Sequence, residues 1–122
     1  MFAKFIKNKA FFGLPGNPIS SAACFRFFVL PYLYFSLEMS ENKPINAKLK
    51  QKFIKKKKFT RFIKGQLSFS NKSVAEFKVQ NGQESFRIKP FTKSNAWGLF
   101  PSGKSRFKKN DYIKCYTLTG IN

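Results

Sequence analysis

The segment Gly13–Pro18 restricts the backbone more than any other part of this 122-residue chain. The short, mostly apolar run 10–14 precedes it, and a run of this length between turn residues favours a buried strand over a helix. Pro15-Gly16 predicts a tight turn, with proline in the first central position and glycine, which tolerates φ > 0, in the second. Asn17 is a favoured N-cap and Pro18 a favoured first helical residue. We therefore expect a strand, a turn and a helix in succession.

The start of this helix is suited to an anion. The backbone N–H groups of Ile19, Ser20 and Ser21 are expected to be free, and the positive end of the helix dipole lies behind them. The Ser20 hydroxyl adds a further donor at the same place. These donors predict an oxyanion site. The alternative is that the N–H groups bind only water, as at most helix starts.

The helix is expected to contribute apolar side chains to a core. Four of them fall at helical spacing, namely Phe25, Phe28, Val29 and Tyr32. An aromatic stripe that contacts bases or a partner is the alternative. Pro31 is expected to kink or end the helix. Because Arg26 and Pro31 interrupt the apolar stretch, a buried amphipathic helix is expected and no membrane span.

The charge of the chain is strongly positive: 24 Lys and Arg stand against five Asp and Glu, a formal net charge of +19. Such a balance is typical of proteins that bind nucleic acid or an anionic membrane. However, Phe, Asn and Ile are also abundant and Arg is scarce, which a coding bias would explain. The lysine-rich segment 48–58 therefore predicts a strand with a solvated edge. A phosphate-binding patch is the alternative, within a small basic protein that binds nucleic acid through residues 48–64.

The two cysteines, Cys24 and Cys115, are far apart in the sequence. No metal-ligand spacing is present and the chain has no histidine, so no zinc site is expected. Free thiols, as in cytosolic proteins, are the prediction, and a disulfide is the alternative.

From Phe59 onward the hydrophobic period becomes two, which is typical of strands. Strands are expected at 75–79, 86–89 and 112–118. Turn signals separate these runs at Asn71-Lys72, Asn81-Gly82, Pro101-Ser102-Gly103 and Lys109-Asn110-Asp111. Asn81-Gly82 predicts a type I′ hairpin. Short strands punctuated in this way predict a small antiparallel barrel or sandwich.

Two stretches carry a resemblance to a known family. The first stretch, residues 13–31, reads Gly-Leu-Pro-Gly-Asn-Pro-Ile-Ser, followed by Cys-Phe-x-x-Phe-Val-x-Pro. It is similar to the molybdopterin molybdenumtransferase family, to which gephyrin is related. Residues 94–101 are similar to part of the C-terminal β-barrel domain of the same family. The resemblance implies an α+β chain, in which a remnant of an α/β domain (strand, Pro-Gly-Asn-Pro turn, helix) precedes a small antiparallel β-barrel domain.

The resemblance also implies a division of the chain. Residues 1–38 correspond to the end of the molybdopterin-binding α/β domain, 39–47 to a polar linker and 48–122 to the barrel domain. Members of the family have several domains, so this chain resembles the last part of a longer one. The activity implied is transfer of molybdenum from molybdate into adenylylated molybdopterin, with release of AMP, in molybdenum cofactor biosynthesis.

The family works as cytoplasmic homodimers, with the active-site cleft between the Pro-Gly-Asn-Pro domain of one subunit and the barrel of the other. Its magnesium ligands belong to the N-terminal part, which has no counterpart here. This chain alone is therefore expected to be inactive, its catalytic residues are not identified, and neither nucleic acid nor a membrane is an expected partner.

The resemblance implies seven residues that bind molybdopterin or molybdate: Pro15, Gly16, Asn17, Pro18, Ser20, Arg61 and Ser85. Hydroxyl, N–H and guanidinium groups are the donors expected around a tetrahedral dianion. The chain departs from the family at Phe86, where the family has glycine, and a large side chain there narrows the approach to Ser85.

Overall fold

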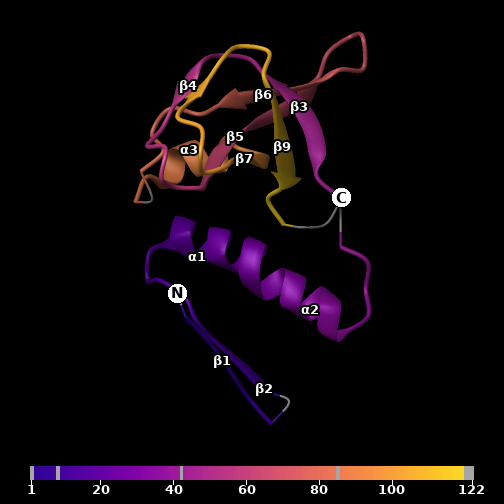
Figure 1. The fold of residues 1–122 in the computed structure, drawn as a ribbon, viewed down its shortest axis with the longest axis vertical. Helices are drawn as coiled ribbons and strands as arrows, with labels where there is room; N and C mark the ends of the chain where they lie inside the picture. Colours follow the sequence, from indigo (N-terminus) through magenta and orange to yellow (C-terminus); the bar gives the residue numbers. More distant parts are fainter. Residues whose placement is uncertain (1, 8, 42, 85, 120–122) are drawn as a thin grey trace. The chain divides into compact units, whose positions relative to one another are not determined.

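The computed structural model describes residues 2–7, 9–41, 43–84 and 86–119. The chain divides into two compact units, one of residues 1–41 with 84–88 and one of residues 42–83 with 89–122. Figure 1 shows the elements of both units.

The first unit consists of a hairpin and a helix. Strands β1 (Phe2–Ile6) and β2 (Lys9–Gly13) pair antiparallel. Helix α1 (Pro18–Cys24) continues through a π-helical turn, η1 (Phe25–Val29), into α2 (Leu30–Ser36) (Figure 1). The predicted strand and helix on either side of the Pro-Gly-Asn-Pro segment are confirmed, but the expectation that the strand is buried is wrong, because no residue of β2 is buried and Phe11 is 61% exposed. Strand β1 was not predicted.

One face of the hairpin packs on the helix through aromatic rings. The ring centroids of Phe5 and Phe12 each lie 5.4 Å from that of Tyr32. Phe5 and Phe12 also contact each other edge-to-face across the hairpin, with centroids 6.1 Å apart. This aromatic cluster holds β1 and β2 against α2.

The expectation that Phe25 and Phe28 face the core is wrong, because 44% and 51% of their surface is exposed. The side chain between them, Arg26, is buried instead. The physical reason is η1, in which the Leu30 N–H bonds to the Phe25 carbonyl. Each π-helical turn adds a residue and so rotates the following face away from a regular 3.6-residue period.

The helix does not end at Pro31, which lies in the first turn of α2. By length and composition alone, the helix Pro18–Ser36 could cross a membrane. A core helix of a soluble protein passes the same test. Ile19 and Arg26 are the buried residues among those described in this helix, so the expectation of a buried helix is wrong.

The second unit is built on a closed barrel, as predicted. Its strands follow the order β3-β6-β5-β7-β9. They are β3 (Ile45–Leu49), β5 (Arg61–Phe69), β6 (Ala75–Val79), β7 (Ala96–Phe100) and β9 (Tyr112–Thr117). All neighbours pair antiparallel except β3 and β6, which are parallel. A short antiparallel pair, β4 (Phe53–Ile54) with β8 (Arg106–Phe107), forms a separate two-stranded sheet (Figure 1).

Alternate residues of the barrel strands, together with Phe107 of β8, form its core. The buried members of this cluster are Ala47, Leu49, Ile63, Ala75, Phe77, Val79, Ala96, Phe100, Phe107, Ile113 and Cys115. Phe53 adds to this core from β4, since its ring centroid lies 4.6 Å from that of Phe100. The short β4–β8 pair is thereby anchored to the barrel by one face.

Two local predictions for residues 81–89 are wrong. Residues 86–89 do not form a strand, because the helix α3 (Ile88–Thr92) begins there. Pro90 lacks the N–H that a barrel strand needs and is tolerated in a first helical turn. Asn81-Gly82 does not form a type I′ hairpin, because Gly82 has a φ of 73° but Asn81 has no positive φ. The turns at 101–103 and 109–111 are confirmed.

Candidate functional site

The start of α1 has the predicted cap. Asn17 has extended backbone angles, φ −81° and ψ 124°, and its side chain accepts hydrogen bonds from the Ile19 and Ser20 N–H groups. The distances from Asn17 Oδ1 to these nitrogens are 3.1 and 3.4 Å. The Ser21 hydroxyl donates to the Pro15 carbonyl, which fastens the loop to the helix.

The expectation of free N–H groups at this helix start is wrong. The Ile19 and Ser20 N–H groups bond to the Asn17 side chain, and the Ser21 N–H bonds to the Asn17 carbonyl at 2.8 Å. Capping and oxyanion binding compete for the same donors. An anion can therefore bind here only if the Asn17 side chain turns away, and Ser20, which is half-buried, supplies a hydroxyl beside it.

Gly16 does not adopt the conformation that the turn prediction required. It has no positive φ, and a Cβ built on it would meet no atom within 4 Å. The loop is an open bend rather than a turn with glycine in the left-handed region. Backbone freedom is therefore not the reason for a glycine at this position in the described conformation.

Arg61 lies at the beginning of β5, opposite Phe100 of β7, and is exposed. It lines a hollow of about 410 Å³ together with Lys56, Phe59 and Thr60. This hollow is a basic, partly aromatic surface that an anion can reach. Arg61 belongs to the second unit, whereas Pro15, Gly16, Asn17, Pro18 and Ser20 belong to the first.

Ser85, the other residue expected on the barrel side, lies outside the described residues. The neighbouring Phe86 is described, and 70% of its surface is exposed. The roles implied for Arg61 and Ser85 therefore stay predictions.

A buried cation that the sequence analysis missed is Lys64, which is 1% exposed. Its Nζ donates to the Gly82 carbonyl at 3.0 Å, and its backbone N–H donates to Gln83 Oε1 at the same distance. Gln83 Nε2 in turn donates to the carbonyls of Lys64, at 2.8 Å, and Gln80, at 2.6 Å. Lys64 and Gln83 thus fix the segment 80–83. Lys64 alternates with the core-facing residues Ile63 and Gly65 on β5, so no local signal in the sequence marks its burial.

Arg26 is a second buried cation that was not assigned a role. Its Nη1 lies 4.0 Å from Glu41 Oε1, and its guanidinium carbon lies 5.5 Å from the centre of the Phe27 ring. Because burial of a charge is costly unless it is partnered, these contacts make Arg26 part of the first unit's packing.

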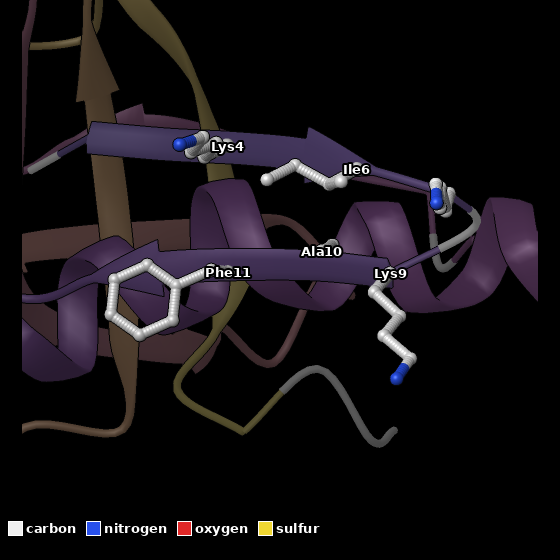
Figure 2. A pocket seen from close by; sticks show the side chains of 6 residues that line it. Lys4, Ile6, Lys9, Ala10 and Phe11 are labelled. Atoms are coloured by element: carbon white, nitrogen blue, oxygen red, sulfur yellow. The ribbon is translucent and has the colours of Figure 1, made fainter.

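The face of the hairpin opposite Phe5 and Phe12 forms another hollow, of about 540 Å³. Figure 2 shows Lys4, Ile6 and Phe11 projecting on this side. Its lining is mainly apolar, and its polar groups are lysines. No carboxylate, hydroxyl or thiol lies among the lining residues that the structure describes.

The described parts of the chain contain no group of three or more His, Cys, Asp or Glu residues that could hold a metal ion. Both Cys24 and Cys115 are free thiols, as predicted. Burial of the Cys115 thiol in the barrel raises its pKa to about 12, so it stays protonated at neutral pH.

The fold class that these observations define is a hairpin-and-helix unit followed by a small closed barrel. No protein-family model and no curated protein matches the sequence. Solved structures do match the fold. A molybdenum cofactor biosynthesis protein from Pyrococcus furiosus is 16% identical over 82% of this chain and 35% of its own, with a TM-score of 0.70.

Two structures of a molybdopterin biosynthesis moeA protein from Pyrococcus horikoshii match as well. One is 21% identical over 98% of this chain and 29% of its own, with a TM-score of 0.70. The other is 20% identical over 82% of this chain and 25% of its own, with a TM-score of 0.67. This chain therefore has the fold of part of these proteins and spans about a third of their length or less.

Proposed function

We propose that this chain is the C-terminal part of a molybdopterin molybdenumtransferase, which inserts molybdenum from molybdate into adenylylated molybdopterin and releases AMP. The observation that carries the proposal is the fold likeness to a moeA protein over 98% of the chain. It includes the segment 13–31, on which the sequence resemblance to the transferases rests.

The donors on each unit suit the proposed substrate. Molybdate is a tetrahedral dianion, for which hydroxyl, N–H and guanidinium donors are suitable. The first unit offers Ser20 and the helix-start N–H groups, which Asn17 releases if its side chain rotates. The second unit offers Arg61 beside Lys56 in an open hollow. Ser85, which lies outside the described residues, completes the set of binding residues that the family resemblance implies.

The remainder of the reaction belongs to residues outside this chain. No acidic cluster suited to magnesium exists among the described residues, so we assign no step through that ion to them. The chain by itself is therefore proposed to be inactive, and its full-length form to be a cytoplasmic homodimer. Each of these statements rests on the family resemblance.

A chimera tests the proposal. In the Pyrococcus horikoshii moeA protein, the segment that matches this chain is replaced by this chain. We expect the purified chimera to bind molybdate in equilibrium dialysis, and Arg61→Ala to weaken that binding without changing the melting temperature. The matched control is Arg106→Ala, an exposed arginine of β8. Equal affinities of the Arg61→Ala variant and the parent chimera would remove Arg61 from the proposal.

A further inference from the structure

The β4–β8 pair presents cations on one face and aromatic rings on the other. Phe53 is opposite Phe107, and both contact the Phe100 ring of the core, whereas Ile54 is opposite Arg106, and both are exposed. We call the exposed face and its flanking turns the basic ribbon. Its cations are Lys52, Lys56, Lys57, Lys58, Lys104, Arg106, Lys108 and Lys109.

The lysine turn of this ribbon, residues 56–59, is a built structure rather than a solvated strand edge. It is organised around Lys55, which is 6% exposed and whose Nζ donates to the Phe59 carbonyl at 2.7 Å. The Lys55 N–H bonds to the Ser105 carbonyl, and the Gly103 N–H bonds to the Lys57 carbonyl, each at 2.9 Å. One buried lysine thus holds the three exposed ones in place.

The positive charge is concentrated in the second unit and is not neutralised there. This unit holds 19 of the 24 Lys and Arg residues but only two acids, Glu76 and Asp111. Glu76 pairs with Lys50, and Asp111 pairs with Lys104. A coding bias alone would enrich both units. Like charges on paired strands repel each other, so this face gains stability from an external polyanion.

Exposed apolar groups lie among these cations. Phe59, in the lysine turn, is 52% exposed, and Ile54, on the ribbon face, is 65% exposed. Aromatic rings beside a cationic track stack on the bases of single strands, whose π-faces are open, but not on the paired bases of a duplex. We propose that the basic ribbon binds single-stranded nucleic acid, with lysines on the phosphates and Phe59 against a base.

Fluorescence anisotropy of the full chain with a labelled single-stranded oligonucleotide of about 16 nucleotides tests this proposal. We expect log K to fall linearly with log salt, with a slope of about 0.7 per neutralised phosphate. A triple variant should bind more weakly and show a shallower slope of log K against log salt; it carries Lys56→Gln, Lys57→Gln and Lys58→Gln. Phe59→Ala should lose roughly five- to 150-fold in affinity with the slope unchanged, because stacking releases no counterion.

The matched control removes the same charge elsewhere in the second unit: Lys72→Gln, Lys78→Gln, Lys89→Gln, all exposed positions. If both triple variants lose affinity equally, the binding follows net charge and the basic ribbon is not its site.

Tighter binding to duplex of equal length would overturn the single-strand assignment. Tighter binding to anionic phospholipid vesicles at the same salt would replace nucleic acid by a membrane. Circular dichroism confirms that each variant is folded, and none of these outcomes depends on molybdate binding.

Discussion

The ring of Phe77, on β6, lies against the backbone of Gly98, on β7, so closely that a Cβ on Gly98 would come within 2.7 Å of the ring. Gly65, on β5, faces the same ring. Two strands therefore lack side chains where the third contributes a large one. The Phe77 ring thus occupies the space that side chains at these two positions would otherwise fill.

Replacement of Gly98 by alanine should destabilise the barrel by about 1–3 kcal/mol, because the added methyl group forces the Phe77 ring to move. Trp97, which is 2% exposed on β7, reports barrel unfolding by its fluorescence in urea. The control is Gly16→Ala, where a Cβ meets nothing within 4 Å and φ is not positive. An unchanged urea midpoint for Gly98→Ala would show that the ring does not fill this space.

Replacement of Asn17 by alanine should cost about 0.5–2 kcal/mol at the start of α1. The physical reason is that the Ile19 and Ser20 N–H groups lose their common acceptor. Amide hydrogen exchange should accelerate at these two residues while barrel amides stay unchanged. Asn17→Asp, which keeps the acceptor oxygen, should exchange as the parent does. Equal protection in Asn17→Ala would contradict the cap.

Asp111 should titrate below its ordinary range. Its Oδ2 accepts hydrogen bonds from Lys104 Nζ at 2.7 Å and from the Lys108 N–H at 3.0 Å, and the first of these lowers the pKa of this carboxyl most. Because the folded-state pKa is lower than the unfolded one, the ionised carboxylate stabilises the fold above about pH 4. This stabilisation is lost as the pH falls through the folded-state pKa. An NMR titration that follows the side-chain carboxyl carbon of Asp111 should give a higher pKa in the Lys104→Gln variant than in the parent. No movement would mean that Lys104 does not hold the carboxylate.

Cys115 should resist alkylation in the folded chain, because its pKa of about 12 leaves almost no thiolate at pH 8 and the barrel buries it. Mass spectrometry after brief iodoacetamide treatment should find Cys24, which is only half-buried, modified first. Both cysteines should react in denaturant. Faster labelling of Cys115 than of Cys24 without denaturant would show that the barrel opens readily.

Local signals in the sequence predicted much of the fold. The alternation at 75–79 and 112–118 corresponds to β6 and β9, and Asn17-Pro18 starts a helix as expected. β1 was missed because lysines interrupt its apolar pattern. The prediction of which helix side chains after residue 24 face the core was wrong, because η1 inserts a π-helical turn that no local signal marks.

The candidate site was less accessible from sequence. The prediction of free N–H groups at the helix start was wrong, because the competition of the Asn17 side chain for two of them appears only with side-chain geometry. The burial of Lys64 depends on Gln83, a residue 19 positions away, and the order of the lysine turn depends on Ser105. Such contacts across strands have no periodic signature in a single chain.

The most direct test of the central claim is cofactor formation by the chimera in cells that lack their own moeA protein. The chimera carries this chain in place of the matching segment of the Pyrococcus horikoshii protein. Molybdenum bound to molybdopterin is then quantified in extracts by mass spectrometry. We predict that the chimera restores the molybdenum cofactor and that Arg61→Ala lowers the yield. A folded, soluble chimera that forms no cofactor would contradict the proposed function.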